Sequence, residues 1–129
     1  MTTRLLPALS FVIAVSLFAC HANAMAPSEL LQSCASIAKV AKPSQSNQID
    51  IPAAGLPCWY FMSAVQNMSV LTDERGSRML GICAPPESSV LDYVQIFVRS
   101  VRRKSAGAGD NAAAQVVAAL AESYPCPSK

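Results

Sequence analysis

Histidine is almost absent from this sequence of 129 residues: the one histidine is His21, near the N-terminus. The N-terminal segment that contains it has the features of a removable signal, so we expect the mature chain to carry no imidazole. This excludes Ser-His-Asp and Cys-His catalytic sites and histidine-ligated zinc or haem. A C-x-x-C pair and a glycine-rich phosphate-binding loop are also missing from the sequence. We therefore expect no enzymatic activity, no cofactor and no metal site.

Charged residues are scarce as well, since Asp, Glu, Lys and Arg make up 14% of the chain and the formal net charge is +2. The charges of the mature part nearly cancel once Arg4 leaves with the signal. Apart from the local cluster "RSVRRK" at 99–104, the composition gives no support for nucleic-acid binding. Because cations stabilise the C-terminal end of a helix, we interpret this cluster as the last turn of a helix.

The N-terminus, residues 1–24, has the pattern of a secretory signal peptide. An apolar run follows Arg4, and Ala22 and Ala24 form the A-x-A pattern that precedes a cleavage site. The apolar run is short for a membrane span, and no second one follows it. Cleavage after Ala24 leaves residues 25–129, roughly one hundred residues, as one small domain.

A lipoprotein signal is an alternative interpretation of the same segment, because "LFAC" places Leu17 and Ala19 ahead of Cys20. A lipidated Cys20 would hold the protein at a membrane. The A-x-A pattern favours simple cleavage.

Four cysteines remain in the exported chain under either interpretation, and an even set in an oxidising compartment predicts two disulfides. The chain between them is mainly helical in pattern, with breaks at proline and glycine. Apolar residues recur at helical spacing over 26–42, 58–73, 85–103 and 111–124. We therefore predict an all-α protein, a small disulfide-stapled bundle of about four helices.

The third helical segment is the most clearly amphipathic, and the fourth is expected to begin after a cap at Asp110 or Asn111. In the second segment, one side is expected to face the core. Its residues are Phe61, Ala64, Val65, Met68, Leu71 and Thr72.

The cysteine positions predict the pairing. If the third and fourth helices form an antiparallel hairpin, the start of one lies beside the end of the other, and Cys83 meets Cys126. By the same argument, Cys34 in the first helix pairs with Cys58 at the start of the second. Bridges that close loops of this size stabilise a small domain by on the order of 3 kcal/mol each.

Four stretches of the mature chain resemble the Rap/Tai immunity proteins. They are Cys34 in the first helix, "CWYFMSAV" from Cys58, "CAPP" from Cys83 and the closing "AAQVVAALAESYPC" that ends at Cys126. The resemblance implies a small, exported, disulfide-bonded helical protein that resides in the periplasm and is often dimeric. It also implies the function: such proteins protect Gram-negative bacteria from peptidoglycan amidases delivered by type VI secretion.

Two other classes of protein fit the same composition. A small periplasmic stress chaperone would also be helical and disulfide-bonded. The mature chain has few acidic residues and no histidine, so few of its groups would change protonation when the pH falls, which argues against this class. A structural envelope protein is favoured only if Cys20 is lipidated.

A protein without catalytic residues would inhibit an amidase by occlusion, with a preformed loop placed in the enzyme's cleft. Two loops are candidates, "TDERGSRMLG" at 72–81 and "RRKSAGAGDN" at 102–111, and we favour the first because it runs directly into a bridged cysteine. An ordinary solvated connector is the alternative interpretation of either loop. The predicted partner-binding residues of the first loop are Asp73, Glu74, Arg75, Gly76, Ser77 and Arg78.

Ile96 is an apolar residue on the polar side of the third helical segment. It falls among Asp92, Arg99 and Arg103. We therefore predict that Ile96 is exposed and contributes to a homodimer contact.

Overall fold

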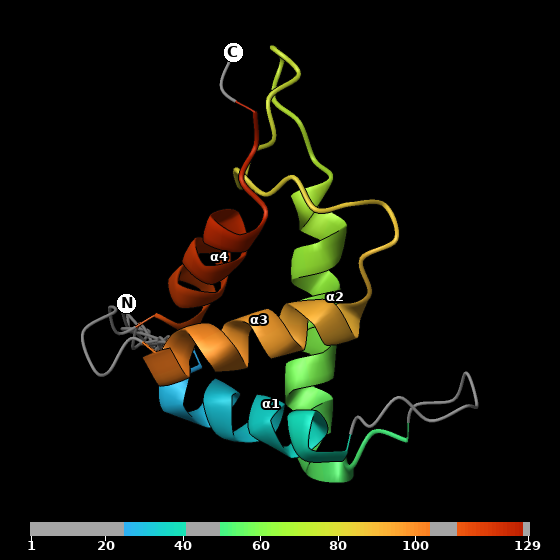
Figure 1. Cartoon of the computed structure of the whole chain (residues 1–129), viewed down its shortest axis with the longest axis vertical. Coiled ribbons are helices and arrows are strands. Elements are labelled where there is room, and N and C mark those ends of the chain that lie inside the picture. The colour runs from blue at the N-terminus through green and yellow to red at the C-terminus, as the bar shows by residue number, and fades with distance from the viewer. Residues whose placement is uncertain (1–24, 41–49, 104–110, 128–129) are drawn as a thin grey trace, which may run out of the picture.

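The computed structural model describes residues 25–40, 50–103 and 111–127 of the chain. The predicted signal peptide and most of the second candidate loop, at 104–110, lie outside these residues. In the described part, four α-helices and one short 3-10 helix form a single all-α bundle, as the sequence predicted (Figure 1). The helices are α1 Pro27–Val40, η1 Ala53–Gly55, α2 Leu56–Ser69, α3 Val90–Arg103 and α4 Ala112–Ser123.

Helix α3 lies at the centre of the bundle. It packs against α1, α2 and α4, and Figure 1 shows it crossing α2 and covered by α1 and α4 on opposite sides. A helix with neighbours on three sides must bury more than one stripe of its surface. The side chains that α3 buries are Tyr93, Val94, Ile96, Phe97, Val98 and Ser100.

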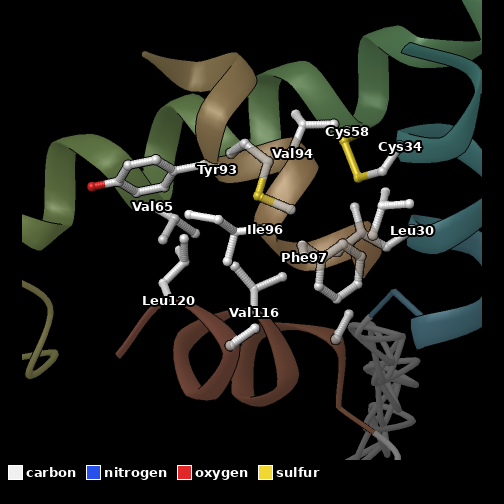
Figure 2. Packing of buried hydrophobic residues seen from close by; sticks show 14 of the residues in the cluster. Leu30, Cys34, Cys58, Val65, Tyr93, Val94, Ile96, Phe97, Val116 and Leu120 are labelled. Atoms are coloured by element: carbon white, nitrogen blue, oxygen red, sulfur yellow. A yellow bond between two sulfur atoms is a disulfide. The ribbon is translucent and has the colours of Figure 1, made fainter. Parts of the chain in front are cut away.

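The prediction that Ile96 is exposed is wrong, because its side chain is only 7% exposed. In Figure 2 it lies among Val65 of α2 and Val116 and Leu120 of α4. The helical pattern placed Ile96 on a side of α3 next to charged residues, but α4 packs over that side. The two arginines that share this side, Arg99 and Arg103, lie nearer the end of the helix and stay exposed.

The predicted core face of α2 is also largely wrong. Val65 is buried as expected, but Ala64 is exposed, and Met68 and Leu71 are 46% and 51% exposed. The side that faces the core is rotated from the predicted one. Its buried residues are Cys58, Met62, Val65 and Ser69.

Helix α3 begins at Val90, later than its two prolines suggested. The start is set by a capping box: the Ser89 hydroxyl and the Asp92 backbone N–H are 3.3 Å apart, while the Asp92 carboxylate accepts the Ser89 backbone N–H at 2.7 Å. Such reciprocal bonds satisfy N–H groups that the first turn of a helix leaves without partners. Helix α4 is capped by Asn111, one of the two predicted residues, whose side chain accepts from Ala113 and Ala114.

The described residues form two disulfides, Cys34–Cys58 and Cys83–Cys126, with Cα separations of 5.1 and 4.9 Å. These are the two pairs that the cysteine positions predicted. The first is buried between α1 and the first turn of α2, and the second joins the segment before α3 to the segment after α4. Each therefore ties together elements that are distant in the sequence.

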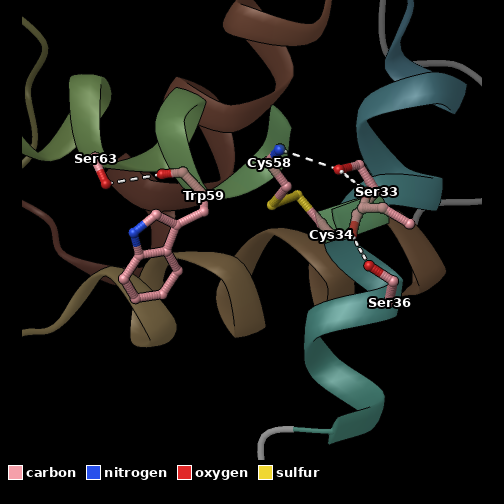
Figure 3. The surroundings of a disulfide bond; sticks show 7 residues. Ser33, Cys34, Ser36, Cys58, Trp59 and Ser63 are labelled. Carbon is pink, nitrogen blue, oxygen red and sulfur yellow. Dashed lines mark hydrogen bonds between the residues drawn. A yellow bond between two sulfur atoms is a disulfide. The ribbon is translucent and has the colours of Figure 1, made fainter. Parts of the chain in front are cut away.

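A cross-helix cap lies beside the first disulfide (Figure 3). The residue before α2 is Gly55, which has no side chain to cap the helix. Ser33 of α1 takes that role, because its hydroxyl accepts the Cys58 N–H at 3.0 Å and donates to the Ala54 carbonyl at 2.8 Å. The first turn of α2 is thus held by both a covalent bond and hydrogen bonds from α1.

Candidate partner-binding site

The segment between α2 and Cys83 folds into a short hairpin that projects from the helical body at the upper end of α2 (Figure 1). An isolated antiparallel bridge joins Thr72 to Arg78. Backbone bonds continue on both sides of it: the Asp73 N–H donates to the Ser77 carbonyl at 2.9 Å, and the Met79 N–H donates to the Leu71 carbonyl at 3.0 Å. The predicted candidate loop is therefore a defined turn between paired backbones.

Asp73 organises the tip of this hairpin. Its carboxylate oxygen Oδ1 accepts the backbone N–H of Arg75 at 2.9 Å and that of Ser77 at 2.8 Å. The Gly76 N–H donates to the Asp73 carbonyl at 3.0 Å, and Gly76 has a φ of 74°. Glycine adopts this left-handed conformation without the steric cost that a Cβ brings. The tip therefore needs Asp73 and Gly76 to adopt its shape, whatever their role in binding.

The base of the hairpin is fixed to the body at two points. The Arg78 guanidinium donates through Nη1 to the Val70 carbonyl at the end of α2. Farther along, Ile82 is buried and forms a bridge with Pro125, and the Cys83 N–H donates to the Tyr124 carbonyl at 2.9 Å next to the second disulfide. Both strands of the hairpin are therefore anchored to the helical body.

The structure brings six of the seven predicted partner-binding residues together on this projection. Asp73, Glu74, Arg75, Gly76 and Arg78 are exposed, and Ser77 is half-buried. Two acidic residues, Asp73 and Glu74, precede two basic residues, Arg75 and Arg78, on a surface whose backbone is held by hydrogen bonds. Ile96 is not part of it, because it lies in the core on α3.

Ile96 instead forms part of the wall of a separate hollow of about 490 Å³. Arg99, Arg102 and Arg103 of α3 and Ser123 of α4 complete the wall. The three guanidiniums make this surface basic. They also lie near the C-terminal end of α3, where cations are favoured by the helix dipole.

The exposed apolar residues of α2 and the hairpin were not predicted as a set. The large hydrophobic side chains that are exposed among the described residues all lie in the segment 56–79. A signal for this was present, because residues 51–72 contain no charged residue, so helical pattern alone could not tell which side faces the core. The exposed residues are Leu56, Tyr60, Met68, Val70, Leu71 and Met79.

Neither a metal-binding cluster nor a membrane-spanning helix is found in the described part of the chain. Within 25–40, 50–103 and 111–127, no three His, Cys, Asp or Glu side chains come close enough to hold a metal ion. No helix of this part of the chain combines the length and the apolar character needed to cross a membrane.

Comparison with known proteins gives one family. The model of the Rap1a immunity proteins matches residues 27–126, which include all four helices, both disulfides and the hairpin. No curated protein and no solved structure matches the chain.

Proposed function

Since the chain belongs to the Rap1a immunity protein family, we propose that it protects its cell by binding and occluding a peptidoglycan amidase delivered by type VI secretion. The observation that carries the mode of action is the anchored hairpin at 71–79, whose shape is fixed before any partner arrives. A preformed protrusion loses little conformational entropy when it enters a cleft. We assign no catalytic step to the immunity protein.

In this proposal Gly76 and Ser77, at the tip, approach the amidase cleft. Asp73, Glu74, Arg75 and Arg78 surround them and meet charges at the rim of the cleft. Charged groups at the rim of an interface mainly increase the association rate and the specificity. Asp73 and Arg78 have a second task, because their side chains also hold the hairpin together.

The test is an inhibition assay with the purified cognate amidase effector. Gly76 is a poor site for a bulky substitution, because its φ of 74° would strain any side chain and change the hairpin as well. Ser77→Trp blocks the tip without that complication. We expect it to weaken inhibition at least tenfold, because an indole cannot follow a hydroxyl into a cleft shaped for the native tip.

Glu87→Trp is the matched control, since Glu87 is exposed on a separate turn before α3. It is expected to inhibit like the wild type. Full inhibition by Ser77→Trp would move the site away from the tip. If the wild-type chain binds no amidase, the immunity function itself is wrong.

The compartment is part of the proposal. We place the mature protein in the periplasm, exported by residues 1–24, where a peptidoglycan amidase acts. Intact-mass measurement of the protein isolated from cells separates the alternatives: a chain beginning at Met25 supports simple cleavage, whereas a diacylglyceryl group on Cys20 would make it a lipoprotein.

We also propose a homodimer, now without Ile96. The exposed aromatic residue Tyr60, 69% exposed on the charge-free part of the chain, is a better contact because two copies of an uncharged surface can meet without repulsion. Light scattering on Tyr60→Asp should show half the mass of the wild-type protein. A wild-type protein that is already monomeric would exclude the dimer.

A further inference from the structure

The charged tip of the hairpin stands on an apolar base. Four exposed side chains surround the point where the hairpin leaves α2, and we refer to them as the collar: Met68, Val70, Leu71 and Met79, exposed by 46%, 60%, 51% and 65%. They are brought together by the backbone, because the Met79 N–H bonds to the Leu71 carbonyl and Arg78 bonds to the Val70 carbonyl. The sequence separates Met79 from the other three by eight or more residues, so only the hairpin assembles the collar.

Exposed apolar residues are ordinary when they are scattered, but a contiguous group marks an interaction surface. The collar lies on one projection, and the described residues expose no large hydrophobic side chain outside 56–79. The charged residues of the hairpin lie between Leu71 and Met79, and one of them, Arg78, reaches back to the Val70 carbonyl. The projection therefore has a mainly apolar base, which also holds the Arg78 guanidinium, and a polar, charged end.

We propose that the collar is the main apolar contact for the amidase effector, packed against the lip of the cleft that receives the hairpin tip. This inference rests on the proposed function and assigns the strength of binding to the base of the hairpin. Well-packed apolar residues at the centre of an interface provide most of the affinity, while exposed charges contribute little. A partner that takes the tip into a cleft must also cover the collar, because the two are continuous along 68–79.

Shape and charge favour the effector over a second copy of this chain as the occupant. A protrusion needs a concave partner with an apolar lip. The hollow beside α3 and α4 is concave, but three arginines line it, so it does not complement the collar. An enzyme that cuts a polymer, by contrast, has a cleft.

The experiment measures the affinity of the full mature chain for the purified effector by titration calorimetry. Leu71→Asp and Leu71→Lys place opposite charges at one exposed collar position. If apolar contact matters there, both variants should bind at least about 30-fold more weakly, which is the size of loss found at residues that dominate an interface. A purely electrostatic contact would instead be weakened by one charge and strengthened by the other, which would contradict the proposal.

Leu56→Asp is the matched control, because Leu56 is also an exposed apolar residue, 38% exposed, but lies at the N-terminal end of α2, about three helical turns from Met68. It should bind the effector within about threefold of the wild type.

Thermal unfolding followed by circular dichroism checks that each variant is folded, and Met79→Asp provides a second collar position if Leu71 variants unfold. Unchanged effector affinity in folded Leu71 or Met79 variants overturns the proposal, and a fall in molecular mass in those variants would assign the collar to the dimer instead. If the wild type shows no binding to the effector, the proposed function fails independently of the collar.

Discussion

Gly55 and Ser33 show how single residues hold α2 against α1. A Cβ built on Gly55 would lie 2.5 Å from Ile37 Cγ1, so the absence of a side chain lets the two backbones approach. Ser33 then reaches across to the first turn of α2 and satisfies the Cys58 N–H. Both residues are small, and neither has a charge or an aromatic ring that would draw attention in the sequence.

Gly55→Ala should therefore destabilise the protein by about 2 kcal/mol, because Ile37 is fully buried and cannot move aside without disturbing the core. Chemical denaturation of the purified mature chain measures this free energy. Gly81→Ala is a useful contrast. Nothing lies within 4 Å of its built Cβ, and the cost comes only from its φ of 65°, about 1 kcal/mol. Equal stability of Gly55→Ala and wild type would show that the α1–α2 contact relaxes easily.

At the scale of elements, α3 determines the bundle, and its start is fixed by local hydrogen bonds. Ser89 and Asp92 exchange bonds at the N-terminus, and the buried Tyr93 follows them directly. The Tyr93 hydroxyl lies 3.2 Å from the Ser69 hydroxyl, which itself donates to the Gln66 carbonyl at 2.7 Å, so Tyr93 is the donor to Ser69. Gln66 in turn donates from Nε2 to the Ser88 carbonyl at 2.7 Å. The start of α3 is thus coupled to the end of α2.

Ser89→Ala removes the cap and should cost about 1 kcal/mol of folding stability. Ser89 is exposed, so the loss reports hydrogen bonding and not core packing. Thermal unfolding provides the measurement, and Ser89→Asp should retain most of the stability because aspartate also caps helices. If Ser89→Ala and Ser89→Asp were equally stable, the capping box would contribute nothing to α3.

At the scale of the whole molecule, the two disulfides stabilise different parts of the structure. Cys34–Cys58 lies in the core between α1 and α2, where both cysteines are fully buried. Cys83–Cys126 closes the longer loop, with a sequence separation of 43 against 24, and holds the return strand of the hairpin beside the C-terminal segment. One bridge therefore supports the helical body, and the other supports the proposed binding surface.

Replacing either pair by alanine should cost about 3 kcal/mol, because the unfolded chain regains loop entropy. The two variants are expected to differ in function. At a temperature where both remain folded, Cys83→Ala/Cys126→Ala should lose inhibition of the effector because the hairpin base is released, whereas Cys34→Ala/Cys58→Ala should inhibit normally. Denaturation curves measure the free energy of unfolding of each variant, and the amidase assay measures its inhibition of the effector. Equal inhibition by both variants would show that the anchored hairpin base is not needed.

The sequence by itself determined the class of fold, the two disulfide pairs and the position of the loop before Cys83, but not that this loop pairs as a hairpin. These depend on local signals: helical spacing of apolar residues, breaks at proline and glycine, and cysteines at the ends of neighbouring helices. The α4 cap at Asn111 was predicted for the same reason, since a cap acts within one turn of its helix.

Only the tertiary structure decided which faces are buried. Ile96 is in the core because α3 has neighbours on three sides. The helical pattern shows which charged residues lie beside Ile96 on the same helix, but it does not show which other helices pack over that side. Met68 is exposed because α2 is apolar on more than one side and α1 and α3 cover another side, and Leu71 is exposed because α2 ends at Ser69 and Leu71 lies on the projecting hairpin. The collar exists only because the hairpin brings Met79 beside Leu71, and a contact between residues eight positions apart depends on the turn that joins them.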